Sequence, residues 1–389
     1  MAFWLTSSPC FNRGQFEEIY FHFSTGFKMS TKRIKLASGL SDFSEIRTKG
    51  ILYIDKTKYI HDLISDIEYK YWFLARPRRF GKTMFVDTLE QLFLGNEELF
   101  RGLYIHSKGY DFKPCPVIRL NMARSASSTD ELKSSIISHL EAIAEEKELA
   151  LKSQTPGDAL ERLIIDFQKK TKQPIVVLID EYDKPILDHI NNTELALKIR
   201  GTLHDFYVSL KNVEDKLRFV FVTGISKFGK TAIHSALNNL SDITHDDNYA
   251  AICGYTEKEL LDNFSPLFNG LINSLAPSGI FNGKDNNKNL VNSILDKYNG
   301  YSWDGNTRIL NPYSINNCFS KQKLDNYWWA TGPPLLLEHA ISLNPTAYLP
   351  SNWSNLTAQD VDKTEIDDLR PVSVLFQTGY LTIDTATIK

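Results

Sequence analysis

The chain has 389 residues, of which 42% are hydrophobic and 23% charged, and its formal net charge is −3. This length allows about two or three domains of an ordinary globular protein. A charge so near zero gives no overall attraction to nucleic acid. Four widely spaced cysteines predict neither a disulfide framework nor a zinc site, and no apolar run reaches the roughly 18 residues of a membrane span. We therefore expect an intracellular, cytoplasmic protein without a membrane partner.

The N-terminal residues do not have the pattern of a signal peptide. Residues 1–28 are aromatic and irregular, and they lack the continuous apolar core of a signal peptide. Met29 is an alternative start of the chain. We interpret residues 1–35 as an N-terminal extension, for which disorder is one interpretation.

The most informative stretch begins with an apolar run at residues 69–75, which predicts a strand. A loop at residues 76–83 follows, reads Arg-Pro-Arg-Arg-Phe-Gly-Lys-Thr, and precedes an amphipathic pattern. Strand, loop and helix in this order are typical of a phosphate-binding loop. Its backbone N–H groups and helix N-terminus hold anionic oxygens, a Lys reaches the outer phosphates, and a hydroxyl binds Mg²⁺. The usual pattern, G-x-x-x-x-G-K-[ST], has a glycine where this chain has Arg76.

An acidic partner motif lies further along the chain. Residues 175–181 read Ile-Val-Val-Leu-Ile-Asp-Glu. Five successive apolar residues indicate a parallel strand that is buried on both faces. Asp180 then lies at its carboxyl end, where open α/β sheets place ligands. Such an Asp helps to hold Mg²⁺ in phosphate-loop ATPases, and Glu181 is well placed to polarise the attacking water.

A second Gly-Lys-Thr run competes with the first. Residues 217–223 predict a strand ending at Thr223, where related ATPases keep a polar residue that senses the γ-phosphate. Residues 224–231 then fit the phosphate-loop pattern in full. The acidic pair normally follows the phosphate loop, and only residues 76–83 precede it. We therefore assign the phosphate loop to residues 76–83 and the second run to the sensor region.

The spacing of these elements predicts the fold. Helical patterns separate the strands, and a short run at 249–253 is a candidate fifth strand. This alternation predicts a parallel sheet with helices on both faces. A strand at 116–121 falls between the phosphate-loop strand and the acidic strand, as in AAA-type and related signal-transduction ATPases. The predicted helices lie at residues 83–94, 130–151, 157–170 and 194–213.

The character of the chain changes after residue 255. Residues 256–259, Thr-Glu-Lys-Glu, form a capping box that opens a helix. Asn and Gly then accumulate over residues 269–289, as in a loop. Further helix is predicted near residues 290–298 and 313–319, and buried helix around Trp328, Trp329 and residues 335–337. We interpret the chain as a P-loop NTPase domain of the α/β class at 36–255, a smaller helical, lid-like domain at 256–345, and a C-terminal linker at 346–389.

Taken together, eight blocks resemble the AAA-ATPase-like family, from about residue 36 to 381. In that family the phosphate loop carries Arg at the position of Arg76, so the missing glycine is expected. The usual sequence at residues 227–230 resembles Lys-Phe-Ser-Lys, so Gly229 completes a false motif. The blocks are residues 53–57, 76–83, 178–185, 221–228, 237–244, 253–256, 311–315 and 327–332.

Members of this family usually continue into a C-terminal nuclease-like domain of the PD-(D/E)XK superfamily. Residues 377–381, Gln-Thr-Gly-Tyr-Leu, resemble the lead-in to that domain, and the sequence ends at Lys389. We expect the domain to be absent, through a naturally short form or a truncated gene model. The resemblance therefore implies no nucleic-acid cleavage by this chain.

These arguments define a predicted site for ATP and Mg²⁺. ATP is assigned to Arg78, Arg79, Phe80, Gly81, Lys82 and Thr83, Mg²⁺ to Thr83 and Asp180, and catalysis to Glu181 and Thr223. Arg78 and Arg79 neutralise phosphate, act in trans as arginine fingers, or form a solvated basic loop. Asp183 is interpreted as a helix cap or ion-pair partner, and Asp55 and Lys56 as members of a structural ion pair.

The predicted function is that of a Mg²⁺-dependent ATPase acting as a nucleotide-driven conformational switch. One alternative is an interaction module that binds ATP with little turnover. Another is a truncated member of a nucleic-acid processing system of mobile-element or defence type, and a third is an inactive, decayed product. Besides ATP, the expected partner is an unidentified protein or a second copy of the chain. Nucleic acid stays open as a partner without support from the net charge.

Overall fold

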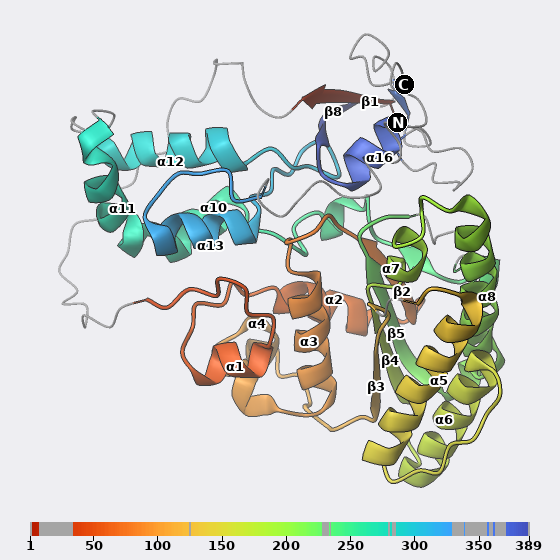
Figure 1. Ribbon diagram of the computed structural model, residues 1–389. Coiled ribbons are helices and arrows are strands. Elements are labelled where there is room, and N and C mark those ends of the chain that lie inside the picture. Colours follow the sequence, from red (N-terminus) through yellow and green to blue (C-terminus); the bar gives the residue numbers. More distant parts are fainter. Residues whose placement is uncertain are drawn as a thin grey trace.

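A parallel sheet of five strands lies at the centre of the computed structural model (Figure 1). The structure describes residues 2–7, 34–123, 126–227, 233, 235–278, 281, 285–328, 338, 356–357, 361 and 371–387. The strands of the sheet are β2 Tyr71–Ala75, β3 Val117–Asn121, β4 Ile175–Asp180, β5 Leu217–Gly224 and β6 Ser241–Asp242. The predicted α/β fold class is confirmed.

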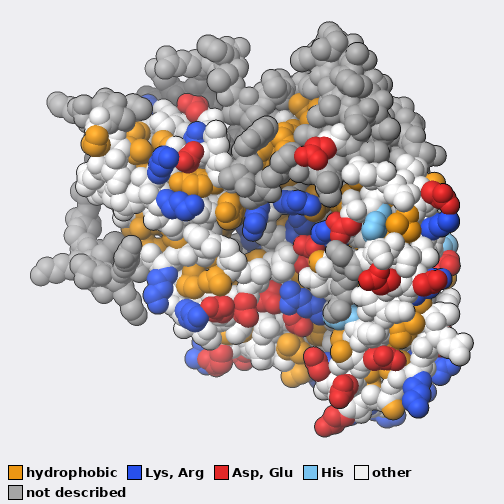
Figure 2. All heavy atoms as spheres, in the orientation of Figure 1, with side chains coloured by type: hydrophobic (Ala, Val, Ile, Leu, Met, Phe, Trp, Pro, Cys, Tyr) orange, Lys and Arg blue, Asp and Glu red, His pale blue; other side chains and the backbone are white. Residues whose placement is uncertain are grey.

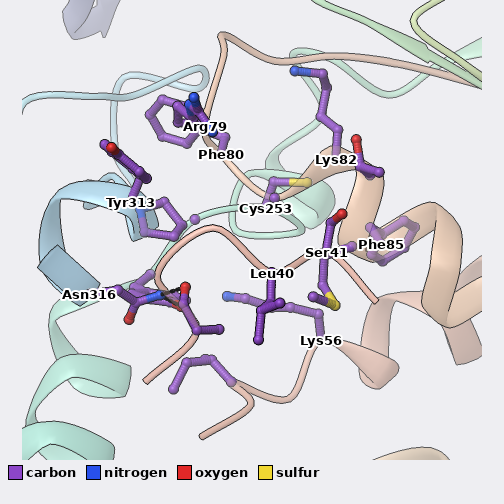
Figure 3. A pocket seen from close by; sticks show the side chains of 18 of the residues that line it. Leu40, Ser41, Lys56, Arg79, Phe80, Lys82, Phe85, Cys253, Tyr313 and Asn316 are labelled. Carbon is purple, nitrogen blue, oxygen red and sulfur yellow. Dashed lines mark hydrogen bonds between the residues drawn. The ribbon is translucent and has the colours of Figure 1, made fainter. Parts of the chain in front are cut away.

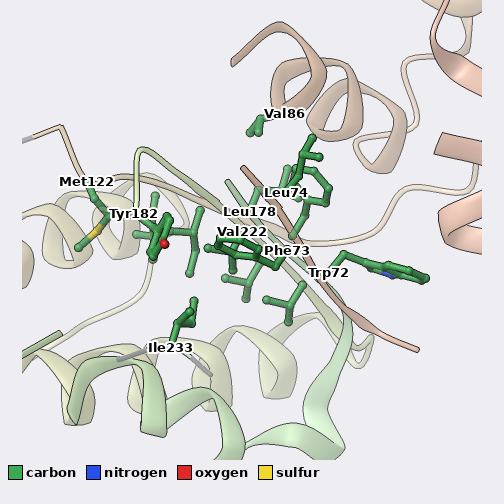
Figure 4. Close-up of a cluster of buried hydrophobic side chains, with 14 of the residues drawn as sticks. Trp72, Phe73, Leu74, Val86, Met122, Leu178, Tyr182, Val222 and Ile233 are labelled. Carbon is green, nitrogen blue, oxygen red and sulfur yellow. The ribbon is translucent and has the colours of Figure 1, made fainter. Parts of the chain in front are cut away.

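Helices cover both faces of this sheet. They are α3 Lys82–Phe93, α5 Thr129–Glu146, α6 Pro156–Thr171 and α8 Thr193–Asn212. Helix α3 lies on one face and the other three on the opposite face (Figure 1). Every residue of β2 and β4 is buried, as expected for parallel strands with helices on both sides. Figure 4 shows Val86 of α3 on one side of the strands and Ile233 on the other.

The strand order positions the functional site. Strand β5 lies between β2, which leads into the loop at 76–83, and the acidic strand β4. Ala75 pairs with Gly224, and Ile179 pairs with Val222, so the carboxyl ends of all three strands meet at one edge. Ligands of open α/β sheets bind at this edge.

The four predicted helices between the strands are present. Ser128, Thr155 and Asn192 precede α5, α6 and α8, and each side chain accepts a hydrogen bond from the backbone N–H three residues later. These side chains satisfy N–H groups that lack a partner within the helix. Helix α5 ends at Glu146 rather than near residue 151, because Glu148 adopts a left-handed backbone with φ of +54°.

The fifth strand was predicted at the wrong place. It is β6, only two residues long, whereas Asp247–Tyr249 forms the 3₁₀ helix η3. The Asp246 side chain accepts a hydrogen bond from Asn248 N and so opens this turn. The apolar run at 249–253 is buried for another reason: its chain packs beside the loop at 76–83, and Gly254 N donates to Phe80 O at 3.0 Å.

The helical region after residue 255 has its own apolar core. Its helices are α10 Glu257–Phe264, α11 Phe268–Leu275, α12 Asn286–Tyr298 and α13 Pro312–Lys321. The predicted capping box at the start of α10 is present. The loop predicted over 269–289 is wrong at both ends, since α11 extends to Leu275 and α12 begins at Asn286. Helix α11 buries Phe268, Leu271 and Ile272. The Phe268 ring stacks on the Phe319 ring, with 5.9 Å between the ring centres.

A separate three-stranded antiparallel sheet joins the two ends of the chain. It consists of β1 Ala2–Ser7, β7 Leu356–Thr357 and β8 Leu381–Thr387 in the order β7-β1-β8, with α16 Pro371–Gln377 leading into β8. Within the N-terminal extension, residues 2–7 are therefore a strand, and most of the extension lies outside the described residues. Trp329 and residues 335–337, for which buried helix was predicted, also lie outside them.

Shorter elements complete the described chain. They are α1 Phe43–Thr48, α2 Thr57–Ser65, η1 Glu97–Phe100, α4 Tyr104–Ser107, α7 Lys184–Leu187, η2 Glu214–Lys216, η4 Ser265–Leu267 and η5 Ala276–Ser278. Among the helices of the described residues, none has both the length and the apolar content for a membrane crossing. Acidic and basic side chains are interspersed on the face shown in Figure 2, in keeping with the small net charge.

Candidate nucleotide-binding site

A cavity of about 630 Å³ lies at the ligand-binding edge of the sheet (Figure 3). One wall is the loop before α3, and the opposite wall comes from the helical region, including Tyr313 and Asn316. The predicted residues that line it are Arg78, Arg79, Phe80, Gly81, Lys82, Thr83 and Glu181. The cavity therefore brings together the predicted phosphate loop and the predicted catalytic acid.

The backbone of the loop is shaped by Gly81. This residue precedes α3 with φ of +94°, a left-handed conformation that glycine adopts readily. Gly81, the N-cap residue, has no side chain with which to cap the first N–H groups of α3. Unpaired N–H groups at a helix N-terminus attract anions, because they donate hydrogen bonds and carry the positive end of the helix dipole.

Lys82 is buried at the first position of α3. Its Nζ donates to Arg76 O at 2.9 Å and to Pro77 O at 3.0 Å, so the loop's own carbonyls hold the ammonium. Burial lowers the pKa of Lys82, and the negative charge of Asp180 counteracts this effect. An anionic ligand in the cavity would stabilise the charged ammonium further.

Asp180 has an unused oxygen. Its Oδ1 accepts from Glu181 N at 2.9 Å, whereas Oδ2 is buried without a hydrogen-bond partner among the described residues. Leaving a buried acceptor unpaired costs about 1–3 kcal/mol, so such an atom calls for an explanation. A cation ligand is one, and Mg²⁺ is typically held by one or two carboxylates together with substrate phosphates and water. The described residues contain no cluster of three or more His, Cys, Asp or Glu side chains for a complete protein cage. Thr83 lines the cavity and Asp180 does not, but the types of these two side chains fit Mg²⁺ that arrives with phosphates.

Glu181 lines the cavity in an unusual backbone conformation. Its φ is +52°, which is uncommon for a residue other than glycine and occurs at functional sites. Burial raises the pKa of Glu181, the charge of Asp180 raises it further, and Lys82 partly opposes both. A carboxylate with a raised pKa is a better proton acceptor near neutral pH.

Thr223 is not brought to the cavity. Its side chain is fully buried, and its hydroxyl donates to Leu74 O at 2.8 Å on the neighbouring strand. A γ-phosphate sensor at this position would have to give up that hydrogen bond. The sequence correctly placed Thr223 near the strand end but did not reveal the direction of its side chain.

Arg76 is a structural residue rather than a solvent-exposed one. Its guanidinium donates to Ala75 O, Thr244 O and Tyr249 O at 2.8–3.2 Å, and lies 4.2 Å from the centre of the Trp303 ring. Burial lowers the pKa of Arg76 to about 10. The arginine thus joins the loop at 76–83 to the segment at 244–249 and to Trp303.

We expect the change Arg76→Gly, which restores the usual motif, to destabilise the protein by at least about 2 kcal/mol. The reason is that three carbonyls would lose hydrogen bonds from a charged group, each contributing about 1.5–3 kcal/mol. Urea unfolding measures this, with Arg78→Gly as the control because Arg78 is an exposed arginine of the same loop. Equal losses in both variants would contradict the structural role of Arg76.

Among the contacts between the sheet domain and the helical region, two involve residues singled out in the sequence. The Arg79 guanidinium lies 4.7 Å from the centre of the Tyr313 ring (Figure 3). Lys56 Nζ lies 2.6 Å from Glu259 Oε1 in a largely buried ion pair. Lys56 therefore forms a structural ion pair, as predicted, and its partner is Glu259. Asp55 instead accepts hydrogen bonds from the backbone N–H and the hydroxyl of Thr57 and from Tyr104 N.

The second Gly-Lys-Thr run does not begin as an anion-binding loop. Its last four residues, 228–231, lie outside the described residues. Ile225 N and Ser226 N, which would cradle phosphate in such a loop, instead donate to the carboxylate of Asp183. Lys227 Nζ lies 3.1 Å from Asp242 Oδ2. These contacts support the assignment of the phosphate loop to residues 76–83.

Several lining residues escaped the sequence analysis. They come from outside the recognised phosphate and acidic motifs and include Leu40, Tyr53, Cys253, Tyr255, Tyr313 and Asn316. Of these, Tyr53, Cys253, Tyr255 and Tyr313 belong to blocks that carried the family resemblance, but their residue types carried no chemical signal of their own.

The parallel sheet, the Gly-Lys-Thr loop before α3 and the acidic end of β4 define a P-loop NTPase of the α/β class. The family described as "Predicted AAA-ATPase" matches residues 37–234, and the chain belongs to this AAA-ATPase-like family. A protein of Azotobacter chroococcum mcd 1, named "Uncharacterized protein in vnfD 5'region", is 34% identical over 355 residues. The match covers 90% of this chain and 64% of that protein, so this chain spans less than two thirds of its relative.

A solved structure of Drosophila ORC bound to GC-rich DNA and Cdc6 contains a chain that matches 72% of this one. The match covers 92% of that chain, with 10% sequence identity and a TM-score of 0.24. At this TM-score the similarity carries no inference about function.

Proposed function

We propose that the chain binds ATP with Mg²⁺ in the cavity and hydrolyses it to ADP and phosphate. The observation that carries this proposal is the buried Asp180 oxygen without a hydrogen-bond partner, together with the buried Lys82 ammonium at the same edge of the sheet. A buried ammonium at the start of α3 is electrostatically coupled to a carboxylate that has a free, buried oxygen. Mg²⁺–ATP would satisfy both groups: its phosphate oxygens would accept from the ammonium, and its cation would bind the free carboxylate oxygen.

The roles of the residues follow from their positions. The N–H groups at the start of α3 and the Lys82 ammonium would bind the phosphate oxygens, and Thr83 and Asp180 would hold Mg²⁺. Mg²⁺ would neutralise charge on the phosphate oxygens. Glu181 would accept a proton from the water that attacks the γ-phosphorus, while the bond to the ADP oxygen breaks.

The cavity walls suggest how nucleotide could change the shape of the protein. Arg79 belongs to the phosphate loop and also contacts Tyr313 of α13, and Lys56 contacts Glu259 of α10. All but Glu259 line the cavity. Phosphate that draws Arg79 towards itself would alter its contact with Tyr313. We therefore propose that ATP closes the sheet domain against the helical region and that hydrolysis reopens it.

Phosphate release by the purified chain tests this proposal. With ATP and Mg²⁺ we expect steady turnover, and removal of Mg²⁺ by EDTA should abolish it, because the Asp180 carboxylate and the phosphates are all negative and would repel each other without the cation. Saturable ATP binding without any phosphate release would instead favour the interaction module with little turnover.

A further inference from the structure

Asp183 follows Glu181 by two positions and is completely buried. Its Oδ2 accepts from Ser226 N at 2.7 Å and from Ser226 Oγ at 2.6 Å, and both oxygens accept from Ile225 N at 3.2–3.3 Å. All of these donors belong to the turn that follows β5. The carboxylate therefore fastens the turn after β4 to the turn after β5.

Tyr182 reinforces the same connection. Its hydroxyl donates to Ser226 O at 2.9 Å, and its backbone N–H donates to Thr223 O at 3.1 Å. The two turns touch so closely that a side chain at Gly224 has no room: a Cβ there would lie 2.4 Å from Asp183 Oδ1. Residues 182 and 183 are thus fixed by contacts with residues about 43 positions away in the sequence.

This connection bears on Glu181, whose backbone is in the left-handed region. A residue with a side chain stays in that region only when its surroundings enforce it. On one side, Glu181 N donates to Asp180 Oδ1 at 2.9 Å, and on the other, Lys184 N donates to Glu181 O at 3.0 Å. The two residues in between, Tyr182 and Asp183, are hydrogen-bonded to the end of β5 and to the residues that follow it. Both Glu181 and Ile225 line the cavity, whereas Asp183 does not.

We propose that Asp183 is a positioning residue for ATP hydrolysis, which holds the Glu181 carboxylate at the cavity by fastening the 181–183 turn to Ile225 and Ser226. This role rests on the proposed function. Asp183 acts through Glu181 and touches no reacting atom. The sequence suggested a helix cap or an ion pair. Asp183 is the N-cap residue of α7, but its side chain does not cap that helix; the carboxylate accepts from backbone N–H groups and a hydroxyl of residues 225 and 226 instead.

Asp183→Asn tests the proposal with almost no change in volume. An amide has one oxygen acceptor, and its NH₂ group would face N–H donors of Ile225 or Ser226, so part of the fastening must be lost. We expect single-turnover ATP hydrolysis to slow by at least about tenfold, since small displacements of catalytic groups are costly. ATP affinity should stay within about threefold because the phosphate loop is untouched. Asp215→Asn, the same chemical change at an exposed acid, should leave both quantities unchanged.

The double variant Glu181→Gln with Asp183→Asn separates positioning from a merely structural role. If Asp183 acts through Glu181, adding Asp183→Asn to Glu181→Gln should slow hydrolysis no further. Ser226→Ala provides a milder test should Asp183→Asn not fold. It removes the hydroxyl that donates to Asp183 and keeps the donating N–H groups of residues 225 and 226. It should also slow single turnover at unchanged ATP affinity.

Three outcomes would overturn the proposal. Hydrolysis by Asp183→Asn at the wild-type rate would do so, as would losses that multiply in the double variant. In the absence of folded Asp183→Asn, an unchanged rate in Ser226→Ala would do so as well. Each of these three outcomes leaves the proposal that the wild-type chain hydrolyses ATP unaffected. A wild-type chain that neither binds nor hydrolyses ATP would overturn the proposed function together with this role.

Discussion

Replacing Lys82 by alanine is expected to weaken ATP binding by at least about a hundredfold. The ammonium is held at the loop by two carbonyls and lies next to the start of α3. Bonds from a charged donor to phosphate oxygens contribute about 1.5–3 kcal/mol each, so two of them account for the expected loss. Calorimetric titration of the folded variant measures the change, and unchanged affinity would disprove the site assignment.

Lys230→Ala is the matched control, because Lys230 occupies the same place in the second Gly-Lys-Thr run. Its ATP affinity should stay within about threefold of wild type, since the N–H groups of Ile225 and Ser226 already serve Asp183. A modest loss of turnover is compatible with an approach of Lys230 to the γ-phosphate. If Lys230→Ala weakens binding more than Lys82→Ala, the two loops have been assigned the wrong way round.

Glu181→Gln should keep ATP binding and slow hydrolysis by at least about a hundredfold. The amide retains the shape of the side chain but cannot accept the proton of the attacking water, and general-base catalysis contributes about 10²–10⁴-fold. Rapid mixing of excess enzyme with ATP, followed by quenching, measures single-turnover hydrolysis directly. A rate equal to wild type would show that Glu181 is not the base.

The sheet and its main helices could be predicted because their signals are local. Residues 175–179 are all apolar, and these five residues and Asp180 are buried. Capping side chains likewise marked helix starts such as that of α10. By contrast, β6 has only two residues, too few for any pattern, and α11 carries Phe268, Leu271 and Ile272 at helical spacing among Asn and Gly residues that favoured a loop.

The site could be predicted only in part, because sequence gives residue types and not side-chain directions. Lys82, Thr83 and Glu181 reach the cavity as their motifs predicted. Thr223 lies at the expected strand end, yet its hydroxyl is bonded within the sheet. Asp183 depends on Ser226, a partner 43 residues away that no local pattern identifies.

Titration of the wild-type chain with ATP in the presence of Mg²⁺ tests the central claim most directly. The account predicts one saturable site per chain, heat of binding that falls sharply when EDTA replaces Mg²⁺, and loss of the signal in Lys82→Ala but not in Lys230→Ala. No binding of ATP to the folded wild-type chain, or equal binding by wild type and Lys82→Ala, would contradict it.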